Sequence, residues 1–158
     1  MTTTTPSMVR NRDDADASWF FNALVTTVAA TPETGGAYNL TEHLVTAASN
    51  PPVHVQVDED EAFYIVDGTV EFEVDGTTSV AEPCTFAFVA RGCAHTFRVL
   101  TPTARMLVIC SGKASDNLHE FFLDMGEPAP VRELPVPGAP DLEKLDRLCA
   151  RTGIELVG

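Results

Sequence analysis

The stretch PPVHVQVDEDEAFYIVDG, residues 51–68, carries the pattern that decides the fold and the candidate site. The short run HVQV and the longer run EAFYIV are typical of β-strands, and an acidic turn separates them. His54 and Gln56 are two residues apart, so their side chains leave the same face of a strand. Glu61 opens the second strand, and His95 follows a later turn. Neighbouring strands can bring such side chains to one metal ion.

Short runs with strand character continue on both sides of this stretch. Asp-Gly pairs at 67–68 and 75–76 separate three of the runs, and this dipeptide is a strong hairpin signal because both residues tolerate a positive φ. Turn signals at such regular spacing predict an all-β fold, an antiparallel sandwich or barrel. The expected strands are 19–29, 37–46, 54–57, 61–66, 69–74, 77–82, 85–90, 95–100 and 105–110.

The C-terminal part changes to helical spacing. Helices are predicted over 115–126 and 141–153, each with a capping residue at its start and a glycine at its end. We therefore expect three regions: a disordered N-terminal tail over 1–17, a β-barrel over 18–114 and a helical extension over 115–158. In the second helix one apolar stripe is expected to pack on the barrel, formed by Leu142, Leu145, Leu148 and Cys149.

Length and composition limit the classes of partner. The 158 residues fit one domain, and the formal net charge of −13 argues against binding to nucleic acid or to an anionic membrane. No apolar run approaches the roughly 20 residues that cross a bilayer. The N-terminus lacks the pattern of a secretory signal, so we expect a cytoplasmic protein. The four cysteines show no CxxC spacing and are expected to be free thiols.

The spacing of these residues resembles the motifs of the cupin superfamily. The first cupin motif runs G-x5-H-x-H-x(3,4)-E-x6-G, and His54, Glu61 and Gly68 match it. The second motif runs G-x5-P-x-G-x2-H-x3-N, and Gly92 and His95 match it. The resemblance implies an antiparallel double-stranded β-helix, the jelly-roll barrel of that family, with short C-terminal helices. It also implies one divalent transition metal ion in the barrel mouth.

Gln56 is the departure that concerns the metal, because the family usually has a histidine there. The amide has three interpretations: a weaker oxygen ligand, a residue that orients a water or substrate, or the mark of a barrel that has lost its metal. His54, Glu61 and His95 still form a set of two histidines and one carboxylate, which suffices to hold Fe(II). The resemblance thus implies His54, Gln56, Glu61 and His95 as metal ligands. Fe, Mn, Ni, Co and Zn remain open. Further departures concern turn geometry or the last motif position: Ala48, Cys84, Ala90 and Val99.

Other polar residues near the motifs lack such support. The acidic residues 58–60 are expected to be solvated in a turn, and His119 to lie on a helix outside the site. Glu42 and His43 are expected to have a surface or packing role. A set of apolar side chains should form the core and part of the cavity wall, which favours an apolar or aromatic small-molecule substrate. These are Phe63, Ile65, Phe72, Phe86, Phe88 and Phe97.

Within the superfamily, the chain resembles the quercetin dioxygenase-like group. This resemblance implies O2 chemistry on a hydroxylated aromatic or enol-type molecule, with Glu61 as the catalytic general base. A metal-dependent cyclase or isomerase of a polyketide-like intermediate and a non-enzymatic ligand-binding barrel are the alternatives. Ala62, Tyr64 and Val66 face away from the cavity and need cover, from a second sheet or from the partner subunit of a homodimer.

Overall fold

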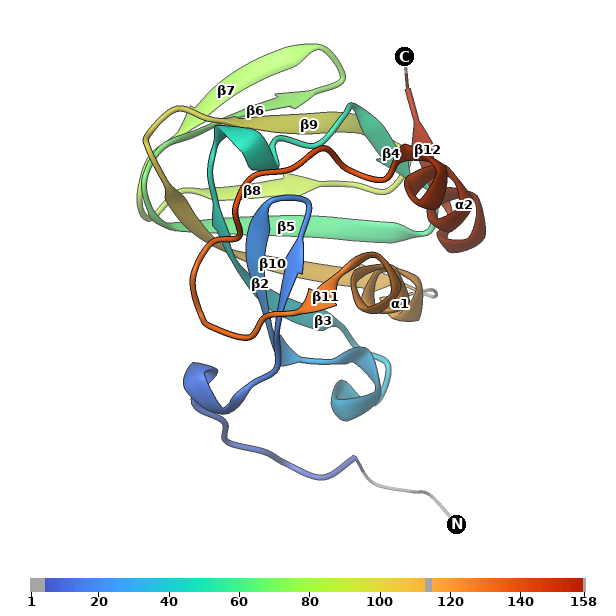
Figure 1. Cartoon of the computed structure of the whole chain (residues 1–158). Helices are drawn as coiled ribbons and strands as arrows, with labels where there is room; N and C mark the ends of the chain where they lie inside the picture. Colours follow the sequence, from blue (N-terminus) through green and yellow to red (C-terminus); the bar gives the residue numbers. More distant parts are fainter. Residues whose placement is uncertain (1–4, 113–114, 158) are drawn as a thin grey trace.

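The computed structural model describes residues 5–112 and 115–157, and these form two antiparallel sheets with helices at one end (Figure 1). The larger sheet has the strand order β11-β1-β2-β3-β10-β5-β8, and the smaller sheet has the order β12-β4-β9-β6-β7. This arrangement confirms the expected jelly-roll barrel. The strands of the larger sheet are β1 (Ala17–Phe20), β2 (Ala23–Ala29), β3 (Asn39–Val45), β5 (Glu59–Asp67), β8 (Phe86–Val89), β10 (Ala104–Gly112) and β11 (Glu127–Pro128). Those of the smaller sheet are β4 (His54–Gln56), β6 (Val70–Val74), β7 (Thr77–Ala81), β9 (Ala94–Val99) and β12 (Ile154–Leu156).

The core lies between the two sheets, and strand alternation selects its residues. In β6, Val70 and Phe72 are buried, while the glutamates between and after them point away. Phe72 meets Phe63 of the larger sheet with ring centroids 4.9 Å apart. Each apolar side chain of this size contributes about 1.5–3 kcal/mol when it is fully buried. The expected Asp75-Gly76 turn is present, with positive φ at both residues.

Alternation also corrects one expectation about aromatic residues. Phe86 and Phe88, expected to supply core or cavity wall, are 62% and 57% exposed. They occupy the outward positions of β8, and the smaller Ala87 and Val89 take the inward ones. Because a strand places neighbouring side chains on opposite faces, register overrides side-chain size here. With Tyr64, these rings give β5 and β8 an exposed apolar outer face, on which Tyr64 lies opposite Phe86.

The prediction of a single strand over residues 19–29 is wrong, because this segment forms a hairpin. β1 and β2 pair with each other, and the tight turn between them consists of Phe21 and Asn22, which have φ values of 50° and 60°. Phenylalanine is a rare residue in this conformation, so the sequence carries a weak turn signal. Asn22 anchors the turn: its side chain donates to the carbonyls of Ala48 and Gly138 and accepts from the Gly138 N–H.

Replacing Asn22 with alanine is expected to lower the free energy of unfolding by about 1–3 kcal/mol, because both the side-chain hydrogen bonds and the tolerance of positive φ are lost. Asn22→Gly is the matched control, since glycine keeps the backbone conformation and removes only the hydrogen bonds. Urea denaturation of the three proteins measures the difference. Equal stability of all three would contradict an anchoring role for this side chain.

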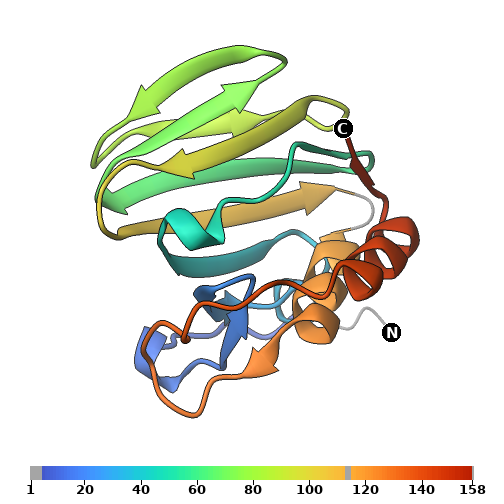
Figure 2. The ribbon, with the colours of Figure 1, turned by 45° about the horizontal axis from the view of Figure 1, so that its top comes forward.

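Two helices cover one end of the barrel, α1 (Ser115–Met125) and α2 (Leu142–Thr152), and they contact each other (Figure 2). Asp141 caps α2 by accepting from the Lys144 N–H, and Gly153 ends it with a φ of 68°, as predicted. Leu145, Leu148 and Cys149 are buried as expected. Leu142 is 63% exposed, because the stripe starts one turn later than predicted.

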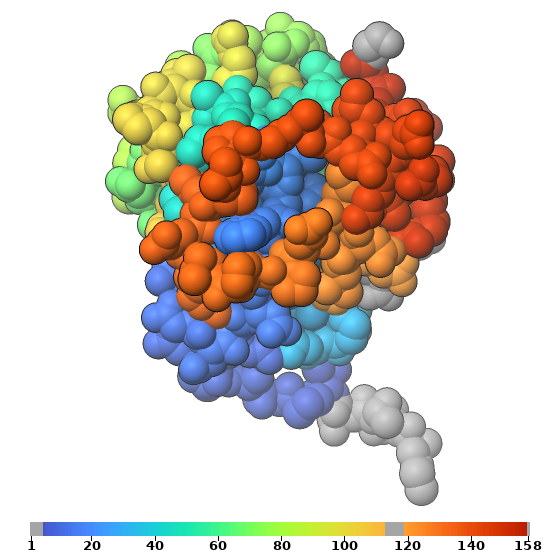
Figure 3. Space-filling model, in the orientation of Figure 1, coloured from blue at the N-terminus to red at the C-terminus, as the bar shows by residue number. Residues whose placement is uncertain are grey.

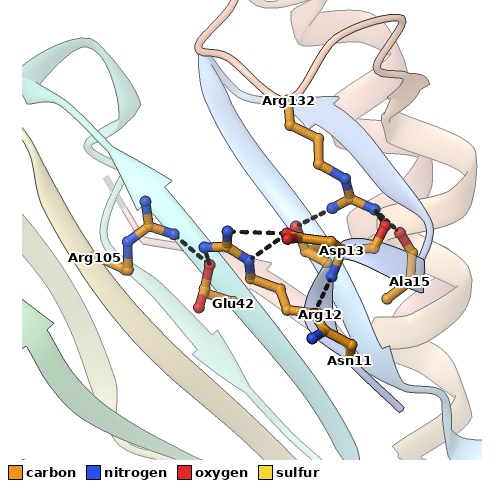
Figure 4. A network of polar contacts seen from close by, with 8 residues as sticks. Asn11, Arg12, Asp13, Ala15, Glu42, Arg105 and Arg132 are labelled. Carbon is orange, nitrogen blue, oxygen red and sulfur yellow. Dashed lines mark hydrogen bonds and ion pairs between the residues drawn. The ribbon is translucent and has the colours of Figure 1, made fainter.

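The N-terminal segment and the connector between the helices lie against the barrel. The short 3-10 helix η1 (Arg12–Asp14) falls within the region expected to be a tail. Arg12 and Arg105 both pair with Glu42 of β3, and Arg132 of the connector donates to backbone carbonyls at residues 13 and 15 (Figure 4). In Figure 3 the connector wraps across the hairpin of β1 and β2, where the Trp19 indole donates to the Glu133 carbonyl. Two further 3-10 helices are η2 (Thr31–Thr34) and η3 (Ala47–Ser49). In the ranges that the structure describes, no helix has the length and apolar character to cross a membrane.

Candidate metal centre

His54, Glu61 and His95 converge between the two sheets. One ligand atom from each of them lies within 4.8 Å of the others. β4 and β9 pair so that His54 is directly opposite His95, and the ring centroids are 4.3 Å apart. Glu61 reaches the pair from β5 in the facing sheet. The structure therefore brings together the two histidines and the carboxylate that the sequence singled out.

Backbone carbonyls orient both imidazole rings. The Nδ1 atom of His54 lies 2.9 Å from the Pro52 carbonyl oxygen, and that of His95 lies 3.0 Å from the Cys93 carbonyl oxygen. A carbonyl only accepts hydrogen bonds, so each Nδ1 carries the proton and donates it. In a neutral ring the lone pair is then on Nε2. This is the arrangement in which proteins present a histidine to a metal ion.

The contact between His95 and Glu61 requires a cation. His95 Nε2 and Glu61 Oε2 are 3.0 Å apart, and with Nδ1 protonated both atoms are acceptors unless a proton or a metal ion lies between them. Burial disfavours the charged form of His95, but the hydrogen bond to Glu61 and its charge outweigh burial and raise the pKa of His95. Burial opposes ionisation of Glu61 too, yet its bond to His95 and the nearby histidines lower the pKa of Glu61. Burial and the charge of His95 lower the pKa of His54.

Gln56 is 3% exposed and touches the same carboxylate. Its Nε2 donates to Glu61 Oε2 over 2.9 Å, so the amide orients Glu61 directly. Its Oε1 atom is buried and has no hydrogen-bond partner among the described residues. An unpaired buried carbonyl oxygen costs about 1–3 kcal/mol, and a metal ion would satisfy it. Once His95 gives up the proton that it shares with Glu61, the two imidazoles, the carboxylate and this oxygen form a donor set that fits a divalent transition metal ion.

The four residues of the candidate centre line a cavity of about 100 Å³. Its walls are largely apolar, and an aromatic cluster forms much of them. The ring of Phe20 meets those of Phe121 and Phe122 edge-on, with centroids 5.5 and 5.0 Å away. Phe63 and Phe97 line the cavity as expected. The sequence reasoning missed Phe20, Phe121 and Phe122, although the helical spacing of the last two indicates that they face the barrel.

Four polar residues that were not expected to belong to the site have the following environments. His43 is 8% exposed and lines the cavity, so packing describes only part of its role. Glu59 is 2% exposed, because it begins β5 instead of lying in a solvated turn, which corrects the expectation for this acidic residue. Asp60 pairs with Arg91 on the surface, and that bond lowers its pKa to about 2. His119 does not line the cavity.

Metal affinity is expected to fall about tenfold for each pH unit below the raised pKa of His95, because one proton must leave His95 before its Nε2 can bind a metal ion. The lowered pKa of Glu61 keeps that carboxylate ionised through the same range. Calorimetric titration with Co²⁺ between pH 5 and 8, in buffers of different ionisation enthalpy, measures the affinity and the protons released. A pH-independent affinity without proton release would contradict this coupling.

The metal-free protein should show the opposite trend in stability. A raised folded-state pKa means that protonated His95 stabilises the fold below its unfolded-state pKa. That contribution is lost as the pH rises through the folded-state value. The Glu61 contribution is present above its unfolded-state pKa and disappears as the pH falls through the lowered one.

Comparisons with known proteins agree with the barrel. The cupin domain family matches residues 41–111, which contain all four candidate ligands. An ectoine synthase from P. lautus superposes with a TM-score of 0.60 at 18% identity, covering 82% of this chain and 93% of the other. A predicted oxalate decarboxylase from Thermotoga maritima gives a TM-score of 0.62 at 14% identity, covering 66% and 99%.

A cupin domain from a Schizosaccharomyces pombe protein superposes with a TM-score of 0.53 at 15% identity, covering 63% of this chain and 72% of the other. A search of curated proteins found no match. At these identities the solved structures establish a shared fold, and the family match covers the strands that carry both motifs. The domain match and the shared barrel together support the cupin superfamily for this chain.

Proposed function

We propose that this protein is a metal-dependent cupin enzyme, a dioxygenase that acts on a hydroxylated aromatic or enol-type small molecule. One observation carries the proposal: two imidazoles and one carboxylate, with ligand atoms within 4.8 Å of one another, line an apolar, aromatic cavity. This donor set is typical of non-haem Fe(II) oxygenases and leaves coordination positions open. The apolar walls suit a substrate with a large hydrophobic surface and few polar groups.

His54, Glu61 and His95 would hold the metal ion, with the Gln56 Oε1 atom as a fourth, weaker donor. When bound, the ion supplies a Lewis acid that lowers the pKa of a nearby hydroxyl group. Glu61 is the candidate general base, because its carboxylate can accept the proton of that hydroxyl. Gln56 Nε2 and the Cys110 thiol hold the two carboxylate oxygens, with the thiol 3.7 Å from Oε1. Phe63 and Phe97 line the same cavity and give this proton transfer apolar surroundings.

The experiment that tests the proposal combines elemental analysis with oxygen-uptake assays. The purified protein is expected to contain about one transition metal ion per chain and to consume O2 in the presence of quercetin or a related flavonol. Removal of the metal with a chelator should stop the uptake, and re-addition of Fe²⁺, Mn²⁺, Ni²⁺, Co²⁺ or Zn²⁺ identifies the ion that restores it. A metal-loaded protein that never consumes O2 with any enol would refute the dioxygenase.

A metal-dependent cyclase or isomerase is the second candidate, and the acid–base groups of the cavity favour it. Glu61, His95 and His43 line the same cavity and are groups that can transfer protons in a reaction that needs no oxidant. Turnover of a polyketide-like substrate under strict anaerobiosis would separate this activity from the dioxygenase. A protein without stoichiometric metal, in which His54→Ala leaves function intact, would instead indicate a ligand-binding barrel.

A further inference from the structure

The cavity contains a polar group outside the metal centre, the imidazole of His43. This residue follows Asn39 and Thr41 on the inward face of β3, and its ring meets Phe122 edge-on at 5.5 Å. Ser49, another polar residue of the lining, is already engaged, because its hydroxyl donates to the Asn22 carbonyl and accepts from the Thr46 N–H. His43 is therefore an imidazole in an otherwise apolar part of the wall.

The contacts of Thr41 favour one tautomer of His43. The Thr41 hydroxyl lies 2.9 Å from His43 Nε2 and 3.5 Å from the Val108 carbonyl oxygen. A carbonyl only accepts, so both contacts are hydrogen bonds when Thr41 donates to Val108, and we infer that His43 Nε2 then donates to the Thr41 oxygen. The lone pair of the neutral ring is then on Nδ1, and Nδ1 has no hydrogen-bond partner within the ranges that the structure describes.

The ring remains neutral at physiological pH. Burial lowers the pKa of His43 to about 4, and the charge of Glu61 offsets this only in part. A neutral acceptor nitrogen that faces a cavity takes a hydrogen bond from the donor that occupies it, which is either a water molecule or a hydroxyl group of a ligand.

We propose that His43 is a substrate-binding residue, whose Nδ1 accepts a hydrogen bond from a hydroxyl group of the ligand in the cavity. The proposal rests on the proposed function for the ligand class, a phenol- or enol-type molecule. His43 and the metal centre line the same cavity, so the ligand is held at two points: one polar group meets the metal centre and a second hydroxyl meets His43. The aromatic wall then contacts its apolar faces. His43 would thus select ligands by their hydroxyl groups and would not take part in the metal chemistry.

A matched pair of probes tests this assignment on the full-length protein. 1-Naphthol has a hydroxyl donor, and 1-methoxynaphthalene presents the same rings without it. Calorimetric titration should show that the unsubstituted protein prefers 1-naphthol by about tenfold, the value of one net hydrogen bond. His43→Phe keeps a ring of similar shape and removes the acceptor, and we expect the preference to fall below about twofold. Thr41→Val removes the hydroxyl that contacts His43 Nε2, so both neutral tautomers become possible and the preference for 1-naphthol should be intermediate.

A second measurement needs no substitution. In protein labelled with ¹⁵N-histidine, the Nδ1 resonance of His43 should have the position of an unprotonated ring nitrogen and should shift on addition of 1-naphthol. Neither measurement needs O2 or turnover, so the calorimetric and NMR results test the role of His43 even if the oxygenase assay fails. A tenfold preference that persists in His43→Phe, a protonated Nδ1, or no preference in the unsubstituted protein, including no binding of either probe, would overturn the proposal.

Discussion

Glu61→Gln is expected to abolish turnover and to weaken metal binding by at least about 100-fold, more than the loss of a residue that only orients a ligand. Glu61 is the anionic member of the candidate ligand set, and its two oxygens receive Gln56 Nε2, His95 Nε2 and the Cys110 thiol. Glutamine has the same shape but no charge, so it cannot neutralise a divalent ion. Calorimetric titration with Co²⁺ and elemental analysis measure the loss.

Glu42→Gln is the matched control for this substitution. Glu42 is a glutamate of β3 that pairs with arginines away from the cavity, so its loss should leave metal content unchanged (Figure 4). Glu61→Gln should also remove the interaction that raises the pKa of His95, which NMR titration of the metal-free protein can follow. Full metal occupancy together with undiminished O2 uptake in Glu61→Gln would show that Glu61 is neither a required metal ligand nor the general base.

The strands and the metal-centre residues could be predicted from sequence because local rules determine them. The Asp-Gly turn at 75–76 sets the register of β6 and β7, and the two-residue spacing of His54 and Gln56 puts both on one face. Gly68 matches a motif position for a visible reason: it has a φ of 79°, and an added Cβ would lie 2.4 Å from the Thr103 carbonyl oxygen. Turn geometry, strand alternation and close backbone contacts each require particular residue types, so they can be recognised in the sequence.

The cavity residues outside the metal centre are harder to predict from sequence, because contacts between segments that are distant in the chain bring them together. Phe20 reaches the cavity only after the unexpected turn at Phe21 and Asn22 reverses the chain. Phe122 contributes through a helix about one hundred residues later. The burial of His43 depends on α1 packing against β3, which no local pattern of β3 predicts. The residues that line the ligand cavity are therefore harder to predict from sequence than the candidate metal ligands.

Gln56→His is expected to strengthen metal binding by about tenfold or more, because an imidazole replaces an amide oxygen as a donor to a transition metal. The position is suited to the change. Gln56 shares the inward face of β4 with His54, and its backbone carbonyl accepts from the Gly92 N–H, which fixes the strand beside the centre. Its side chain already reaches the centre, where the amide Nε2 donates to Glu61 Oε2 over 2.9 Å. Competition with a chelator of known affinity measures the gain.

Gln56→Leu completes the comparison and separates the three interpretations of this residue. If Gln56 is a ligand, leucine should weaken Co²⁺ binding and change the visible absorption of the bound ion, because one donor leaves the coordination sphere. If the amide only orients Glu61, leucine should weaken binding about 10–100-fold while the spectrum is retained. A barrel that has lost its metal would bind Co²⁺ in neither the unsubstituted protein nor Gln56→Leu, and only Gln56→His would regain it. Equal affinity in all three proteins would show that position 56 has no part in holding the ion.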